Sequence, residues 1–384
     1  MIPTASPSSG PAVAALSPRI LWFASLVFLG VFPAVVVGGL FLTAVQDDAV
    51  AMDFQQFYRA AASILRGETP YPAGVPQATW GGPYPYPPLP ALAAIPLTAV
   101  SLKAAELMVM GILVAAALAI PFVLSVRDWR CYGLLLLWPP VISAIQTGNL
   151  TLFLGLAAAL SWRYRDRLLP SSAAVGGALA AKLFLWPLAV WFAATRRIGS
   201  ALLSSLIGAG LLIASWAAIR FDGLVGYPER LQKLDRTIGE DSYTAYIVGL
   251  DLELPSTVAR ALWLALGVGL VAAVVVVGRR GGERSAFILA IAASLALTPI
   301  VWLHYFALLV VVVAVARPRL GVVWFVPLAM VVTPGSGHPA PLETSATLAI
   351  AALTIALALR DSSSREREDP ATAAADRRPV PAGA

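Results

Sequence analysis

Four polar features interrupt an otherwise apolar chain, and their residue types could carry chemistry. They are Asp53, the run QTGN at 146–149, Lys182 and His304. A charged side chain near the middle of a bilayer costs about 2.5–3.5 kcal/mol on insertion scales, so such residues are functional candidates by default. A carboxylate at the mouth of a water-poor cavity can take a proton from a hydroxyl, and a nearby cation can hold a phosphate.

Each of these residues also has a structural interpretation. Asp53 stands three residues before Gln56 and ahead of an apolar stripe, which is the pattern of a residue that only caps its helix. Lys182 could extend its amine to the membrane interface instead of holding a phosphate. The Gly-Asn pair that ends at Asn149 is typical of an ordinary turn, although it could bind hydroxyls. His304 either donates to a phosphate or leaving oxygen, or is hydrogen-bonded within a helical bundle.

The composition places the chain in a membrane. Hydrophobic residues make up 59% of the 384 residues and charged residues only 12%, and the mean hydropathy is +0.79. Soluble domains normally contain about 25% charged residues. Apolar runs recur from Ile20 to Leu359, which predicts an all-α integral membrane protein with a single membrane domain over 19–360. The net charge of +6 comes mainly from arginines in short loops, which is a topology signal and argues against nucleic-acid binding.

The arginine positions predict the topology. If every arginine-bearing turn is cytoplasmic, both termini lie inside and about twelve segments cross the membrane. The first apolar run is too long for a cleavable signal peptide and should remain as a signal anchor. The expected spans are 20–45, 104–126, 131–146, 149–162, a short hairpin 171–195, 199–219, 257–278, 285–300, 302–316, 320–333 and 344–360. Each arm of the hairpin is too short to cross about 30 Å of hydrocarbon, so we expect a broken helix pair that reaches partway in.

The remaining polar sequence should lie outside or at the ends. The first outer loop, 46–103, contains a capped amphipathic helix over 53–66, which is too polar to cross a bilayer and should lie on the membrane surface. The short apolar run 89–100 in that loop should be interfacial or re-entrant. A second outer loop covers 220–256. The tails 1–18 and 361–384 are rich in Pro, Ser, Ala and charge, and we expect them to be disordered and cytoplasmic.

Several other chemistries lack their sequence signals. The chain shows no P-loop, no Gly-rich dinucleotide motif in a βαβ context and no Ser-His-Asp grouping. The single cysteine, Cys131, excludes an intramolecular disulfide and a cysteine-based metal cluster. His338 has no metal-ligand spacing with His304. Asp47, Asp48 and Asp53 could attract a metal ion, but we expect neither a metal nor a cofactor and leave a divalent ion as an alternative.

The polar stretches resemble glycosyltransferase family 87, relatives of polyprenyl-phosphate-mannose-dependent mannosyltransferases with a GT-C fold. The resemblance is carried in order by DFQQFY from Asp53, GETPY ending at Tyr71, YPPL from Tyr86, QTGN at 146–149, AKLF around Lys182, and TPIVWLHY ending at Tyr305. It covers most of the chain from the first span to about residue 316. One departure is that the family often has Gly-Gln-x-Asn where this chain has QTGN.

The resemblance implies a GT-C-type multi-span bundle whose first outer loop supplies a catalytic aspartate, matched here by Asp53. It also implies Lys182 near the donor phosphate and His304 in the cavity, as a catalytic and phosphate-binding residue. The side chains expected to bind substrate are Gln56, Tyr58, Tyr86, Gln146, Asn149, Trp302 and Tyr305. The implied reaction is an inverting transfer of a sugar, mannose by family expectation, from a polyprenyl-phosphate donor to a lipid or glycan acceptor.

The expected location is the cytoplasmic membrane, with membrane lipids around the chain and the site facing outside. Nucleotide sugars are made in the cytoplasm, so an outer-face transferase needs a donor carried across on a lipid phosphate. Two other interpretations remain open. A transporter or flippase of a lipid-linked sugar would use the same cavity without bond cleavage, and an inactive family member could act as an assembly partner.

Overall fold

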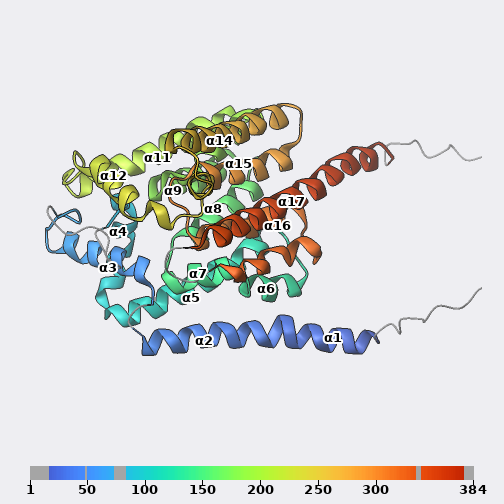
Figure 1. Cartoon of the computed structure of the whole chain (residues 1–384), viewed down its shortest axis with the longest axis horizontal. Helices are drawn as coiled ribbons and strands as arrows, with labels where there is room; N and C mark the ends of the chain where they lie inside the picture. Colours follow the sequence, from blue (N-terminus) through green and yellow to red (C-terminus); the bar gives the residue numbers. More distant parts are fainter. Residues whose placement is uncertain (1–16, 48–49, 73–83, 334–338, 376–384) are drawn as a thin grey trace, which may run out of the picture.

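The computed structural model describes residues 17–47, 50–72, 84–333 and 339–375, and the regular structure in these ranges is entirely helical. Most of the helices run roughly parallel along the longest axis of the molecule (Figure 1). The predictions about a disordered tail over 1–18, about Asp48 and about the spacing of His338 fall mainly on residues outside the described ranges. An all-α membrane protein is what the composition predicts.

Five helices are long and apolar enough to cross a membrane. The first combines α1 (Pro18–Leu26), the π-helical turn η1 (Val27–Val31) and α2 (Phe32–Gln46). The others are α5 (Leu102–Val123), α11 (Ile198–Ala218), α14 (Ser256–Arg279) and the Pro341–Glu366 part of α17 (Pro341–Ala375). A sixth span exists if α7 (Pro139–Thr147) and α8 (Thr151–Arg163), which meet at 118°, count as one. The expected count of twelve spans is therefore not confirmed.

Breaks in the helices account for most of the difference. The expected span 131–146 is divided into α6 (Trp129–Leu136) and α7, because α7 begins anew at a Pro-Pro pair. The expected span 302–316 begins as the 3₁₀ helix η5 (Leu303–Leu308) before α16 (Leu309–Ala316). The expected span 320–333 consists of the 3₁₀ helices η6 (Val322–Trp324) and η7 (Val326–Val332). These pieces are shorter than the roughly 20 residues that a span requires.

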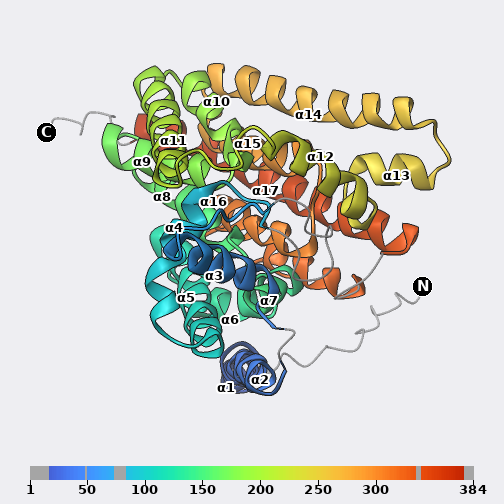
Figure 2. The same cartoon turned by 90° about the vertical axis from the view of Figure 1, so that its left-hand side faces the viewer.

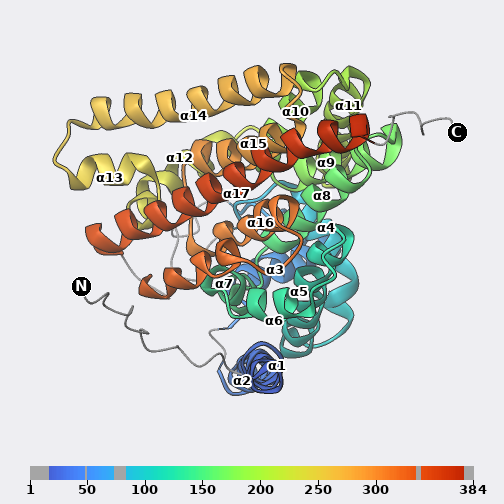
Figure 3. The ribbon, with the colours of Figure 1, turned by 90° about the vertical axis from the view of Figure 1, so that its right-hand side faces the viewer.

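The interior of the bundle is formed by short helices. Every residue of α16 is buried, and α15 (Glu283–Leu297) is buried continuously from Ser285 to Leu295. Figure 3 shows α15 and α16 enclosed between α17, α14 and the helices of the middle of the chain. Their apolar sequences are therefore explained by protein packing, with no need for each to cross a bilayer.

The hairpin 171–195 is broken as expected. It consists of α9 (Leu168–Ala181), η3 (Leu183–Leu185) and α10 (Pro187–Ala194), and the chain becomes extended at Lys182, with φ −163°. Helices α9 and α11 pack closely through glycines: a Cβ added at Gly176 would lie 2.7 Å from Ile207 Cβ, and one added at Gly208 would lie 3.1 Å from Leu179 Cβ.

The first span stands beside the rest of the bundle (Figure 2). It touches α6 where a Cβ added at Gly133 would lie 1.6 Å from the Leu29 carbonyl oxygen. Only glycine permits this approach, so Gly133 determines where the span meets α6. Most of the remaining surface of the span is exposed, as expected for a helix that faces lipid.

The arginine-bearing turns gather at one end of the molecule. Glu283, at the α14–α15 turn, forms ion pairs with Arg165 (3.0 Å) and Arg197 (2.6 Å). These arginines lie in the α8–α9 and α10–α11 turns. Arg317 pairs with Asp361 at 3.6 Å. The sequence explains these arginines by topology alone. The structure corrects that prediction, because the arginines also hold the turns together.

Helix α17 extends into the segment that was expected to be a disordered tail. It continues from 361 to Ala375, and Glu366 caps the start of α15. Glu366 Oε1 accepts from the backbone N–H groups of Arg284 (2.8 Å) and Ser285 (3.2 Å), and Oε2 accepts from Ser285 Oγ (3.0 Å). This acidic side chain satisfies N–H groups that a helix start leaves unpaired, which explains why the segment is ordered.

The opposite end carries the two polar loops. The first contains α3 (Met52–Leu65), α4 (Pro88–Ala94) and the 3₁₀ helix η2 (Ile95–Ala99). The second contains α12 (Tyr227–Ile238), η4 (Gly239–Asp241) and α13 (Ala245–Asp251). Figure 1 shows α3, α4 and α12 at the end away from the last turns of α17. Tyr71 meets Tyr227 in an edge contact at 5.7 Å, and Tyr227 Oη donates to the Pro85 carbonyl at 2.8 Å, so aromatic side chains join the two loops.

Candidate functional site

Helix α3 presents Asp53 from its first turn. The N-cap residue is Ala51, in the left-handed conformation with φ 58°, and Asp53 is the second residue of the helix. The prediction that Asp53 caps this helix is therefore wrong. The Ala51 N–H donates to the Gln146 carbonyl at 2.6 Å, which attaches the start of α3 to the last turn of α7. Helix α3 itself ends as expected, with Gly67 at φ 76° just beyond its C-cap.

Asn149 holds the Asp53 carboxylate. Its Nδ2 donates to Asp53 Oδ2 at 2.7 Å, and both side chains are buried. The orientation of the amide is determined by its other end, because Asn149 Oδ1 accepts from Thr151 N at 2.9 Å and from Thr151 Oγ1 at 2.6 Å. Gly148 does form a turn, with φ 69°, but the Asn149 side chain also contacts the candidate base.

His304 faces the same carboxylate. Its Nε2 lies 3.9 Å from Asp53 Oδ2, and the side chain is 4% exposed. Within the described residues, Nε2 has no hydrogen-bond partner. Leaving a buried polar atom unpaired costs about 1–3 kcal/mol, so the arrangement favours a ligand atom at this position. The ring is held by stacking on Tyr305 at 5.0 Å and by an edge contact with Trp302 at 5.7 Å.

Lys182 turns toward this cluster. Its Nζ donates to the Tyr305 hydroxyl and lies 4.0 Å from the centre of the Tyr305 ring and 5.3 Å from that of Tyr86. Cation–π contacts of this kind stabilise an ammonium group away from bulk water. The snorkelling alternative does not describe this side chain, because its amine is directed to buried aromatic rings.

Burial raises the pKa of the Asp53 carboxyl above its ordinary value of 3.8. The hydrogen bond from Asn149 and the positive charge of Lys182 oppose this shift in pKa, since both favour the ionised form. A carboxylate with a raised pKa accepts a proton more readily than an exposed one, while the opposing contacts keep it able to ionise. The environment therefore suits a general base.

The other predicted site residues divide into two groups. Tyr86 and Tyr305 are buried beside Lys182, Trp302 packs on His304, and the Gln56 Oε1 atom is buried without a hydrogen-bond partner in the described part of the chain. The side chains of Tyr58 and Gln146 lie outside the cluster. Tyr58 Oη donates to the Val100 carbonyl at 2.8 Å. The Gln146 side chain is exposed, and only its carbonyl helps to position α3.

Glu106 was missed by the sequence reasoning. It lies inside α5, is 1% exposed, and accepts from Gln55 Nε2 at 2.9 Å. Its other oxygen lies 3.2 Å from Lys103 Nζ, which also donates to the Ala44 carbonyl at 2.9 Å. This network joins α2, α3 and α5 beneath the helix that carries Asp53. A lone glutamate in an apolar span was itself a signal that could have identified it.

No group of three or more His, Cys, Asp or Glu side chains in the described ranges is arranged to hold a metal ion. The polar groups that do converge include one carboxylate, one imidazole, one amide, and one ammonium that donates to the Tyr305 hydroxyl. This combination can remove a proton, donate to an oxygen and balance the charge of an anion, which are the requirements of group transfer.

The fold and this cluster define an integral membrane protein with a buried acid–base site. The model of glycosyltransferase family 87 matches residues 84–303, which is more than half of the chain. The chain therefore belongs to glycosyltransferase family 87, as the sequence motifs indicated, and is a membrane glycosyltransferase. Searches of curated proteins and of solved structures gave no match. The matched segment contains Asn149 and Lys182, and the structure adds Asp53 to them through the Asn149 hydrogen bond.

Proposed function

We propose that this glycosyltransferase moves a sugar, mannose by family resemblance, from a polyprenyl-phosphate donor to a hydroxyl of a lipid or glycan acceptor. The observation that carries the proposal is the convergence of a buried carboxylate, Asp53, with the unpaired Nε2 atom of His304 at 3.9 Å. Lys182 contributes a positive charge to the same cluster. A base and an anion-binding group side by side are what transfer from a phosphate leaving group requires.

The proposed reaction is a single displacement with inversion. Asp53 removes the proton of the acceptor hydroxyl as its oxygen attacks the anomeric carbon, and the bond from that carbon to the lipid-phosphate oxygen breaks. Lys182 and His304 stabilise the negative charge that develops on the departing phosphate. In this scheme Asn149 positions the base, because its amide donates to the carboxylate oxygen. The scheme needs no metal ion or cofactor, since these side chains supply the positive charge.

The proposed location follows from the distribution of charge. The arginine-bearing turns lie at one end of the bundle and α3, with Asp53, lies at the other (Figure 1). Arginine-rich short loops normally remain in the cytoplasm, so the Asp53 end faces outward and both termini face inward in the cytoplasmic membrane. A donor linked to a lipid phosphate suits that position, because it can reach the site laterally from the outer leaflet.

The experiment that tests the proposal combines purified protein, radiolabelled polyprenyl-phosphate mannose and a membrane-lipid extract. We expect the label to appear on a new product whose anomeric configuration is opposite to that of the donor. Retention of configuration would contradict a single displacement that uses Asp53 as base. The opposite result is label that stays on the donor with every extract while the protein moves the donor across the membrane of proteoliposomes. That result would contradict transfer and identify the protein as a flippase.

A further inference from the structure

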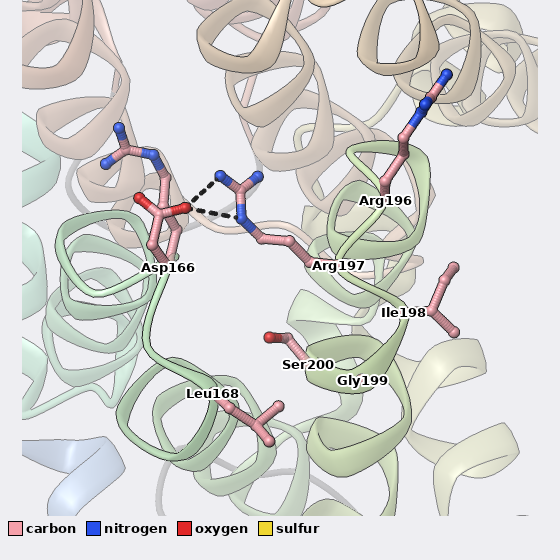
Figure 4. A pocket seen from close by; sticks show the side chains of 8 residues that line it. Asp166, Leu168, Arg196, Arg197, Ile198, Gly199 and Ser200 are labelled. Carbon is pink, nitrogen blue, oxygen red and sulfur yellow. Dashed lines mark hydrogen bonds and ion pairs between the residues drawn. The ribbon is translucent and has the colours of Figure 1, made fainter.

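An open hollow lies at the arginine-rich end of the molecule, at the opposite end of α9 from Lys182. It has a volume of about 310 Å³ and is formed where the starts of α9 and α11 meet. Figure 4 shows Ser200 between Asp166 and Arg197 on one side and Ile198 on the other, with the exposed Arg196 side chain directed away from Ser200. This hollow takes no part in the proposed transfer, because α9, with 14 residues, separates it from Lys182 by about 20 Å.

Ser200 provides the first indication of a ligand. The residue is 5% exposed, and its hydroxyl makes no hydrogen bond within the described part of the chain, although Ser172 and Ser204 both donate to its backbone carbonyl. Figure 4 shows this hydroxyl directed into the hollow. Ser200 is the third residue of α11, a helix of 21 residues, so the unpaired N–H groups and the positive end of the helix dipole lie beside it. An unpaired hydroxyl donor in such a place favours an anion.

Arg196 lines the hollow and adds a positive charge. It follows the end of α10 in the left-handed conformation, with φ 65°, at a position where helices usually have glycine. Among the described residues Arg196 has no carboxylate partner. Arg197, in contrast, pairs with Asp166 at 2.7 Å and with Glu283 at 2.6 Å, and Arg165 shares Glu283. Three arginines against two carboxylates leave the hollow positively charged.

The rim of the hollow is apolar. Leu168 and Ile198, which line it, are 53% and 52% exposed, and Leu169 and Leu202 continue this exposed apolar surface along α9 and α11. A soluble anion would gain nothing from contact with these apolar side chains. A phosphate that carries acyl chains would place its charge in the hollow and its chains along the two helices.

We propose that the hollow binds the headgroup phosphate of an anionic membrane phospholipid. In this site the Ser200 hydroxyl and the first N–H groups of α11 donate to the phosphate oxygens, and the exposed Arg196 side chain turns toward them and balances their charge. The acyl chains extend over Leu168 and Ile198. Since α9 and α11 both begin here, the lipid joins the two helices at the end where their side chains leave a space.

The test compares lipid binding by the wild type with binding by Arg196→Gly. Glycine suits the left-handed backbone, so this variant removes the guanidinium without disturbing the turn. Delipidated protein in detergent is titrated with phosphatidylglycerol, and bound lipid is counted by native mass spectrometry. We expect the apparent affinity to fall at least fivefold in Arg196→Gly and severalfold in Ser200→Ala. The matched control, Arg127→Gln, alters an exposed arginine in the α5–α6 turn and should bind as the wild type does.

Two further titrations identify the chemistry of the ligand. Phosphatidylcholine with the same chains should bind at least fivefold more weakly than phosphatidylglycerol, and glycerol 3-phosphate should not displace the lipid at equal concentration. Equal affinity of the wild type and Arg196→Gly for phosphatidylglycerol would overturn the proposal. Displacement by glycerol 3-phosphate at equal concentration would assign the hollow to a soluble anion and would overturn the lipid assignment.

Discussion

The Asn149 amide donates to Asp53 Oδ2 at 2.7 Å and thereby joins the α7–α8 turn to the first turn of α3. The two residues are 96 positions apart in the chain. The bond helps to explain how a surface helix holds a buried carboxylate. The last turn of α7 accepts the Ala51 N–H through the Gln146 carbonyl, and the turn that follows donates to the Asp53 side chain through Asn149. The position of the proposed base therefore depends on the conformation of this turn.

Gly148→Ala should impair transfer by displacing α3. An added Cβ would lie 2.6 Å from Phe54 Cβ, next to Asp53, and the residue would also have to keep φ at 69°. We expect a loss of about 1–3 kcal/mol in the free energy of unfolding and a larger fractional loss of activity. Gly67→Ala is the matched control, since Gly67 has φ 76° but nothing within 4 Å of an added Cβ. Thermal unfolding and transfer rates measure both effects, and equal losses in the two variants would contradict the role of the turn.

Lys182→Ala should mainly weaken use of the donor. Because the ammonium is assigned to the lipid phosphate, its removal should raise the KM for the donor about tenfold, equivalent to about 1.4 kcal/mol. The value of kcat should fall less. Lys233→Ala removes an exposed lysine of the second polar loop and should change neither constant. Initial rates at varied donor concentration test this prediction, and an unchanged KM for the donor in Lys182→Ala would remove the phosphate-binding role.

The rate of transfer should depend on the ionisation of Asp53. Burial raises the pKa of this carboxyl above 3.8, so activity should fall as the pH is lowered through the raised pKa, at a higher pH than an exposed aspartate would give. The free energy of unfolding should change in the opposite direction. The folded state binds this proton more tightly than the unfolded state, so the stability contributed by Asp53 is lost as the pH rises from 3.8 through the raised pKa.

Asp53→Asn should lack this decrease in stability with pH, because an amide does not titrate. The midpoint of thermal unfolding, measured over that pH range for both proteins, checks the prediction. Parallel curves for the wild type and the variant would show that the carboxyl has an ordinary pKa in the folded protein.

Glu106→Gln should destabilise the helix that carries Asp53. Glu106 accepts from Gln55 on α3 and pairs with Lys103, so the change removes one buried ionic contact and leaves the lysine amine less well paired. We expect a loss of about 1–3 kcal/mol. Glu68→Gln is the control, because its ion pair with Arg66 is 57% exposed on both sides and should contribute little. Thermal unfolding that is equally affected in both variants would contradict a structural role for Glu106.

Local patterns in the sequence predicted local structure well. The helix expected over 53–66 is found at Met52–Leu65, and the break expected in the hairpin lies at Lys182. The capping prediction failed because the N-cap is Ala51, two residues before Asp53, in a left-handed conformation with its N–H bonded to the carbonyl of the distant Gln146. No pattern within α3 contains that contact.

The count of spans failed for a different physical reason. Hydropathy measures how apolar a segment is, but it does not distinguish a helix that faces lipid from one that is enclosed by protein. Residues 309–316 are as apolar as a membrane span, and every one of them is buried within the bundle. The contacts among Asp53, Asn149, Lys182 and His304 could likewise not be read from spacing, because these residues come from four separate segments. The resemblance to a family placed them in one site, and the structure supplies their distances.

The most direct test of the central claim is the rate of sugar transfer by Asp53→Asn, measured beside the wild type and the exposed control Asp222→Asn. The amide oxygen can still accept from Asn149, so folding should be preserved while the base is lost. We predict a fall in rate of about 10²–10⁴-fold for Asp53→Asn and an unchanged rate for Asp222→Asn. A folded Asp53→Asn protein that transfers sugar at the wild-type rate would contradict the assignment of Asp53 as the catalytic base.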